Sequence, residues 1–228
     1  MFIGHFAVAL AAKKAVPKVS LGTLFIASEF VDILWPIFLF CGIEKAEIRP
    51  GDTVFTPLAF VSYPFSHSLM AAVIWGLLVG CTFYLFRRNA RSAMIVALVV
   101  LSHWFLDFLS HRPDLPLTLG GGSRYGLGLW NSFPGTLLVE VGLFIGGLVL
   151  YVQSTNPTDK IGRWGFWSLA GFLLIVYFMN AFGPPPPNMN AVIASAFAMT
   201  ILFLWAYWAD AHRTPIVKSG ASTPPTSD

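Results

Sequence analysis

Five ionisable side chains lie in or at the edges of hydrophobic segments of this 228-residue chain: His5, Asp32, His67, His103 and Asp107. A charge is costly at such a depth, so an unpaired carboxylate is neutralised or expelled unless a partner compensates for it. A metal ion would compensate several of these groups at once. Imidazole and carboxylate ligands together suit zinc, and also iron or manganese. The residue types therefore predict a site for a divalent metal, with zinc as the first expectation.

The spacing of three of these candidates supports one site. His103, Asp107 and His111 follow one another at intervals of four residues, which places their side chains in one stripe if a helix continues that far. Pro113 can instead end the helix at Arg112, so His111 is either a further ligand or a loop residue. An open coordination position would lower the pKa of a bound water to about 7. We therefore expect metal binding by His5, Asp32, His67, His103, Asp107 and His111.

The same chemistry assigns candidate catalytic roles to Asp32, Asp107 and Arg112. The guanidinium of Arg112 could hold a phosphate or carboxylate oxygen of a substrate. Ser66 and Ser68, beside His67, and Ser102, beside His103, are candidates to orient the imidazoles by hydrogen bonds.

Depth provides a separate check on the site. At about 1.5 Å per helical residue, Asp32, His103 and Asp107 lie about 16, 15 and 21 Å from the starts of their hydrophobic segments. A short N-terminal helix dipping into the membrane would lift His5 by about 12 Å above Lys13. The candidates can therefore meet in the middle to outer half of a bilayer.

The composition indicates a membrane protein. Hydrophobic residues make up 56% of the chain and charged residues 11%, with a mean hydropathy of +0.69, whereas soluble domains carry about 25% charged residues. The basic residues are scattered in short loops rather than gathered on one face, so nucleic-acid binding is not expected. The two cysteines are too few for a disulfide framework. We expect the lipid bilayer, and a lipid or lipid-linked substrate, as partners.

The hydrophobic segments predict an all-α polytopic membrane protein with about six transmembrane helices. The expected spans are residues 21–43, 67–86, 94–109, 133–152, 164–182 and 191–208. Residues 1–212 would form the helical domain, with the metal site in residues 1–131 and support from residues 133–210. Residues 213–228 are rich in Ser, Thr, Gly and Pro, which predicts a disordered cytoplasmic tail.

The distribution of basic residues predicts the orientation. With six spans, one set of loops holds ten Lys and Arg residues and the other set holds four. The positive-inside rule then places both termini in the cytoplasm. The loops at residues 44–66, 110–132 and 183–190 would lie outside, and the Pro and Gly content of the first two predicts irregular structure.

Several short motifs resemble a known family. Gly4-His5, Asp32, Ser66-His67-Ser68-Leu69 and Ser102-His103 with Asp107 resemble the membrane-bound metal-dependent hydrolases, also described as inner-membrane, LexA-binding hydrolases. The resemblance covers about residues 4–131. It implies a multi-span helical fold in the bacterial inner membrane and metal-binding roles for His5, Asp32, His67, His103 and Asp107.

The chain departs from this pattern after Asp32. Ile33, Leu34 and Trp35 stand where the family has a second Asp and a His, so we expect one metal rather than two or three. The resulting hypothesis is a hydrolase that uses metal-activated water on a phosphoester or ester of a lipid.

Two other classes also fit the sequence. A transporter or proton relay would bury carboxylates such as Asp32, Glu29, Asp107 and Glu140. A haem protein could use His67 and His103 as axial ligands. The roles of Glu29 and Glu140 are left open by the sequence.

Overall fold

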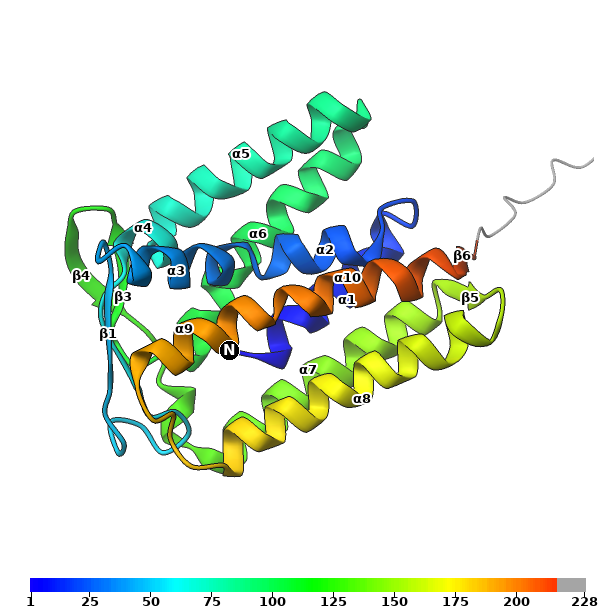
Figure 1. Cartoon of the computed structure of the whole chain (residues 1–228). Coiled ribbons are helices and arrows are strands. Elements are labelled where there is room, and N and C mark those ends of the chain that lie inside the picture. Colours follow the sequence, from blue (N-terminus) through cyan, green and yellow to red (C-terminus); the bar gives the residue numbers. More distant parts are fainter. Residues whose placement is uncertain (217–228) are drawn as a thin grey trace, which may run out of the picture.

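Helices carry most of residues 1–216, the part of the chain that this computed structural model describes (Figure 1). They are α1 (Ile3–Ala15), α2 (Leu21–Ser28), α3 (Phe30–Phe40), α4 (Pro64–His67), α5 (Leu69–Arg87), α6 (Ala90–Ser110), α7 (Phe133–Val152), α8 (Lys160–Phe182), α9 (Met189–Ala198) and α10 (Thr200–Ala211), with a 3₁₀ turn at Leu129–Asn131. Many begin at a polar cap that accepts a hydrogen bond from the backbone N–H three residues on. Such caps are Ser20, Ser68, Asn89, Ser132, Asp159 and Asn188.

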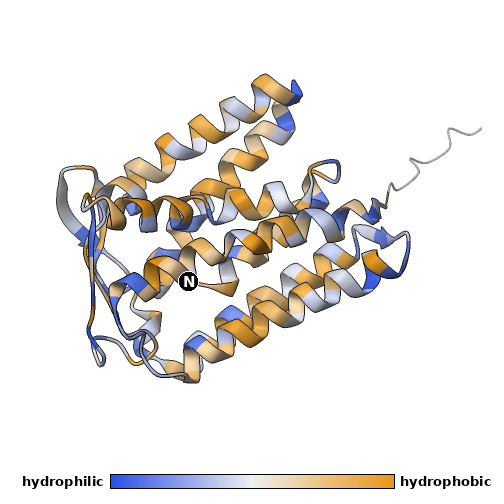
Figure 2. Cartoon of the chain, in the orientation of Figure 1, coloured by the Kyte–Doolittle hydropathy of each residue, from blue (hydrophilic) through white to orange (hydrophobic). Residues whose placement is uncertain are grey.

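The long helices make this an integral membrane protein. Five are long and apolar enough to cross a bilayer, namely α5, α6, α7, α8 and the stretch Met189–Ala211 that α9 and α10 form together. The segment expected as the first span is instead broken at Glu29, where α2 and α3 meet at 51°. Hydrophobic residues cover the helices, and hydrophilic residues gather at their connections (Figure 2).

The two connections predicted to be irregular contain short antiparallel pairs of strands. β1 (Lys45–Ile48) pairs with β2 (Leu58–Ser62), and β3 (Leu115–Thr118) pairs with β4 (Gly121–Tyr125). Both pairs lie at the same end of the bundle (Figure 1). Both connections are mainly non-helical, as expected, but they are not irregular throughout, because the residues between the turns form backbone ladders.

A third pair of strands lies at the opposite end. β5 (Thr155–Pro157) pairs with β6 (Arg213–Pro215), and the Arg213 side chain donates to the backbone carbonyls of Thr155 and Gly162. The predicted disordered tail therefore does not begin at residue 213, because backbone pairing and a buried guanidinium order the start of that segment. Residues 217–228 of the predicted tail lie outside the described residues.

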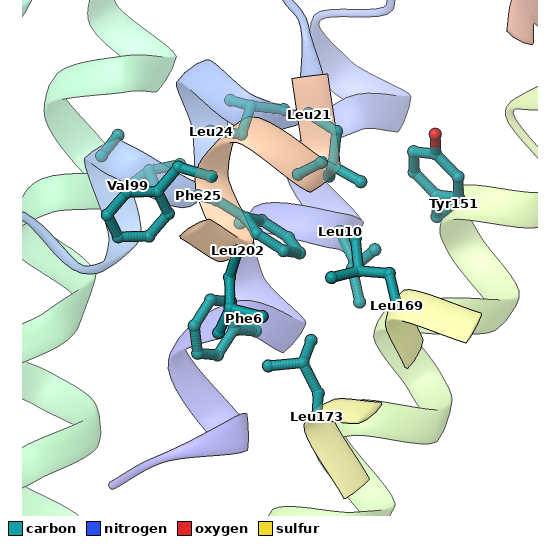
Figure 3. Close-up of a cluster of buried hydrophobic side chains, with 14 of the residues drawn as sticks. Phe6, Leu10, Leu21, Leu24, Phe25, Val99, Tyr151, Leu169, Leu173 and Leu202 are labelled. Carbon is teal, nitrogen blue, oxygen red and sulfur yellow. The ribbon is translucent and has the colours of Figure 1, made fainter. Parts of the chain in front are cut away.

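The N-terminal helix lies inside the bundle rather than at its edge. α1 packs mainly against α7, α2 and α6, and Ile3, Phe6 and Leu10 are fully buried. Figure 3 shows Phe6 and Leu10 among core side chains from other helices, including Phe25 and Leu169. Since α1 is enclosed by helices, His5 reaches the centre of the bundle.

Candidate metal centre

Four of the five histidines of the chain converge on one carboxylate. The Nε2 atom of His5 lies 3.1 Å from Oδ1 of Asp107. The Nε2 atoms of His103, His67 and His111 lie 3.2, 3.8 and 3.9 Å from Oδ2 of the same residue. All five side chains are buried. The structure therefore brings together the histidines that the sequence proposed as ligands.

Asp32 supplies a second carboxylate. Its Oδ1 lies 3.1 Å from Nε2 of His67, and its Oδ2 lies 3.7 Å from Nε2 of His103. The side chain of Asp32 is 36% exposed, whereas those of His67 and His103 are 4% and 1% exposed. The cluster is therefore accessible on the side of Asp32.

The ligand atoms form two overlapping groups. One group consists of His5, His103 and Asp107, and the other of Asp32, His67 and His103. Within each group the candidate ligand atoms lie within 4.8 Å of one another. His103 belongs to both. Each group is compact enough for a metal ion to be held by its members.

Four helices position these side chains. His5 lies in the first turns of α1, and Asp32 lies in the first turn of α3, directly after the break. His67 ends α4 rather than opening the next span, because Ser68 caps α5. His103 and Asp107 lie four residues apart on α6 and share a face, as the spacing predicted.

The break between α2 and α3 orients His103. Carbonyl groups in the last turn of a helix lack an intrahelical donor, and the carbonyl of Ser28, which ends α2, accepts a hydrogen bond from Nδ1 of His103 at 2.7 Å. A carbonyl only accepts, so Nδ1 carries a proton. In the neutral ring, the lone pair then lies on Nε2 and faces the carboxylates.

His111 also has a hydrogen-bond acceptor at its Nδ1 atom, in this case the side chain of Asp114. α6 ends at Ser110, so His111 is its C-cap and not the third residue of a helical stripe. Its Nδ1 lies 2.9 Å from Asp114, which also accepts from the hydroxyl of Tyr63 at 2.7 Å. Burial raises the pKa of Asp114, but hydrogen bonds from His111, Tyr63 and Arg112 outweigh it and hold that pKa below its usual value. Asp114 is therefore an ionised acceptor for Nδ1 of His111.

The electrostatics of the cluster call for a cation. A neutral imidazole that donates through Nδ1 has its lone pair on Nε2, and here that lone pair faces a carboxylate oxygen, which also only accepts. Two lone pairs repel each other at 3.1–3.2 Å unless a proton or a metal ion lies between them. Nε2 of His103 and Nδ1 of His5 are buried and have no hydrogen-bond partner among residues 1–216. Imidazole nitrogens and carboxylate oxygens are suitable ligands for a divalent metal, so these residues fit one. The N-terminal ammonium of Met1 also pairs with Asp107, so it supplies one positive charge beside that carboxylate.

Arg112 is not brought into the cluster. Its guanidinium pairs with Asp52 at 2.9 Å and with Asp114 at 3.2 Å. It therefore reaches the histidines only through Asp114. Its expected role in holding an anionic group of a substrate stays a prediction.

The serines proposed to orient the imidazoles differ from one another. The hydroxyl of Ser66 lies 2.7 Å from Nδ1 of His67. Ser68 instead caps α5, and the hydroxyl of Ser102 donates to the carbonyl of Val99. Of the three, Ser66 alone has a side chain within hydrogen-bond distance of a histidine ring.

Glu140 and Glu29, whose roles the sequence left open, lie at different places in the structure. Oε2 of Glu140 accepts from the backbone nitrogens of Phe2 and Gly4 at 2.8 and 3.4 Å, so Glu140 caps the start of α1. Glu29 is buried at the break, with the Ser28 hydroxyl 3.5 Å from its Oε1. Glu140 therefore supports the helix that carries His5.

Sequence reasoning missed the Ser28 carbonyl and Asp114, which contact histidines, and Glu44, which accepts a hydrogen bond from the Ser66 hydroxyl. Glu44 and Asp114 lie in connections, where an acidic residue is ordinary. The only available signal was the i, i+3 spacing of His111 and Asp114.

The fold and site define a class, a helical integral membrane protein with a buried cluster of histidines and aspartates. Comparison with family models, curated proteins and solved structures found no match to this chain.

Proposed function

We propose that this protein is a membrane-embedded, metal-dependent hydrolase that cleaves a phosphoester or another ester of a lipid or lipid-linked molecule. One observation carries the proposal, namely the convergence of four imidazole Nε2 atoms on Asp107, with Asp32 beside them. The family resemblance of the motifs agrees with it.

The metal ligands in this proposal are His5, Asp32, His67, His103 and Asp107, with His111 at greater distance. Zinc is the first choice, and iron and manganese suit the same ligands. When bound, the metal would supply a nucleophilic water near neutral pH.

The protein's own groups supply the rest of the chemistry. Asp32 is the partly exposed carboxylate of the cluster, so it can accept a proton from water that reaches the cluster from outside. Asp107 is buried, and the four imidazole Nε2 atoms surround its carboxylate. Arg112 can bind an anionic group of a substrate if that group replaces Asp52 as its partner.

A lipid substrate is supported by an apolar hollow on the same elements. The hollow has a volume of about 330 Å³ and lies between α3, α4 and α5, where Phe38, Phe65 and Trp75 line it. α3 carries Asp32 and α4 carries His67. A hydrocarbon chain in this hollow would hold a lipid next to the helices that form the site.

We further propose six spans, with α2 and α3 as one broken span, both termini in the cytoplasm and a place in the bacterial inner membrane. The basic connections α1–α2 and α5–α6 lie towards the β5–β6 end, away from β1–β4 (Figure 1). Cys41 is exposed near β1, so a membrane-impermeant maleimide should label it in intact cells of a Cys81→Ala variant. Labelling only after the membrane is opened would reverse the orientation.

Metal analysis tests the central proposal. The purified protein should contain near-stoichiometric metal, and Asp107→Asn should lose most of it. His212→Ala is the control, because His212 pairs with Asp159 outside the cluster. Screening with chromogenic phosphoesters and fluorescent lipid esters should then reveal hydrolysis that a chelator abolishes. Equal metal in wild type and Asp107→Asn, or no metal in a folded wild type, would overturn the proposal.

The structure bears differently on the two other classes, a proton relay and a haem protein. A proton relay through Asp107, His111 and Asp114 is not continuous, because His111 Nε2 lies 3.9 Å from Asp107, beyond hydrogen-bond distance, and the Arg112 guanidinium beyond Asp114 does not release a proton near neutral pH. Proton flux in proteoliposomes without any hydrolysis would instead support this class. The haem alternative is not favoured, because Nε2 of His67 and Nε2 of His103 approach the same oxygen of Asp107 and leave no plane for a macrocycle between them.

A further inference from the structure

A buried carboxylate outside the cluster is directed at a ligand. Glu44 follows α3, is 2% exposed, and uses both of its oxygens on α4. Its Oε1 accepts from the backbone nitrogens of Phe65 and Ser66, each at 2.8 Å, and its Oε2 accepts from the hydroxyl of Ser66 at 2.6 Å. Glu44 therefore holds the short helix that ends in His67.

The direction of these hydrogen bonds determines the proton position on His67. An ionised carboxylate only accepts, so the Ser66 hydroxyl gives its proton to Glu44. The Ser66 oxygen then accepts from Nδ1 of His67, 2.7 Å away. This leaves the lone pair of a neutral His67 on Nε2, which lies 3.1 Å from Asp32 and 3.8 Å from Asp107.

We propose that Glu44 is a positioning residue that acts through Ser66 to keep His67 in the tautomer that presents Nε2 to the metal. The inference rests on the proposed metal site. His103 and His111 have separate anchors in the Ser28 carbonyl and Asp114, so Glu44 controls His67 alone. A hydrogen-bonded anchor of this kind fixes both the tautomer and the ring orientation of a ligand.

Glu44→Gln tests this with little change in shape. The amide oxygen can still accept from the two backbone N–H groups, but the amide nitrogen donates to Ser66. The Ser66 hydroxyl then donates to Nδ1 of His67, so the proton moves to Nε2. Glu47→Gln is the matched control, since Glu47 is exposed on β1 and pairs with Arg49.

The first readout is ¹⁵N NMR of histidine-labelled, metal-free protein at a pH where the ring is neutral, with His67 assigned by the loss of its signal in His67→Gln. We expect protonated Nδ1 in wild type and Glu47→Gln, and protonated Nε2 in Glu44→Gln. The second readout is zinc titration, in which Glu44→Gln should bind about 10–100-fold more weakly than Glu47→Gln.

The two proposals can fail separately. If Glu44→Gln reverses the tautomer of His67 but the wild-type protein binds no zinc, the role of Glu44 is supported and the metal site is overturned. An unchanged tautomer with unchanged zinc affinity would overturn the role of Glu44 alone. If Glu44→Gln does not fold, Ser66→Ala serves instead, because Glu44 keeps its two backbone donors. His67 should then lose its tautomer preference, and a retained preference would overturn the proposal.

Discussion

The imidazole rings of His5 and His103 lie face to face, with centroids 3.5 Å apart and planes 5° from parallel. Both rings are buried, and both direct Nε2 at Asp107. Two imidazolium ions stacked so closely would repel each other, so a proton on each ring is a poor way to balance the carboxylates. A divalent cation bound in the plane of either ring balances the carboxylate charge without a second proton on the stack.

Metal removal should therefore destabilise the protein. A ligand present at about 100 times its dissociation constant stabilises the folded state by about 2.7 kcal/mol, so a chelator should lower the melting temperature and added metal should restore it. In His103→Ala the chelator should have no effect, since both ligand groups lose a member. An equal response to chelator in wild type and His103→Ala would contradict the assignment.

Asp32→Asn should separate chemistry from binding. If Asp32 accepts the proton from water, its loss should lower kcat by about 10²- to 10⁴-fold. His5, His103 and Asp107 remain to hold metal, so the variant should keep a measurable metal content. Steady-state kinetics with Glu47→Gln as control check the first point and elemental analysis the second. Full activity in Asp32→Asn would remove Asp32 from the mechanism.

The close approach of α1 to α7 should make one glycine irreplaceable. A Cβ added at Gly147 would lie 2.6 Å from the carbonyl oxygen of Ala7, whereas nothing lies within 4 Å of a Cβ at neighbouring Gly146. Gly147→Ala should cost about 1–3 kcal/mol of unfolding free energy and weaken metal binding by displacing His5. Gly146→Ala should be neutral or slightly stabilising. Unfolding in detergent measures both, and equal stabilities would argue against the packing.

Glu140 should matter for stability through α1. In Glu140→Ala the first-turn N–H groups of Phe2 and Gly4 lose their acceptor, which should cost about 1–3 kcal/mol. Glu140→Gln keeps an acceptor oxygen and should cost less. The comparison uses unfolding free energies in one detergent. A larger loss in Glu140→Gln than in Glu140→Ala would indicate that Glu140 does more than cap α1.

Acid should weaken the contact between α8 and the chain after α10. A hydrogen bond from the Gly162 nitrogen, and then one from His212, hold the pKa of Asp159 below its usual 3.8. A lowered folded pKa stabilises the protein above the unfolded pKa, and this contribution is lost as pH falls through the folded value.

The stability of Asp159→Asn relative to wild type measures this contribution. Asparagine still caps the helix, so only the charge is lost. The difference in melting temperature should be constant near pH 5 and should shrink as the pH falls below 3.8, the usual pKa of an Asp. A difference that grew on acidification would have the wrong sign for this mechanism.

The sequence by itself determined the helical membrane character and the shared helix face of His103 and Asp107. Hydrophobic length indicates a span whatever surrounds it, and residues 133–152, expected as a span, form α7. The i, i+4 spacing of His103 and Asp107 places them on one face because helix geometry is local. These features depend on neighbours within a few turns of the same chain segment.

Only the tertiary structure decided how the imidazoles are held. Ser28 and His103 are 75 residues apart, and Glu44 lies 22 residues before Ser66, so no local pattern relates them. The departure of Arg112 towards Asp52 likewise follows from a contact between distant segments. Residue types indicate which groups can bind a metal, but the hydrogen bonds that orient them depend on which segments the fold places side by side.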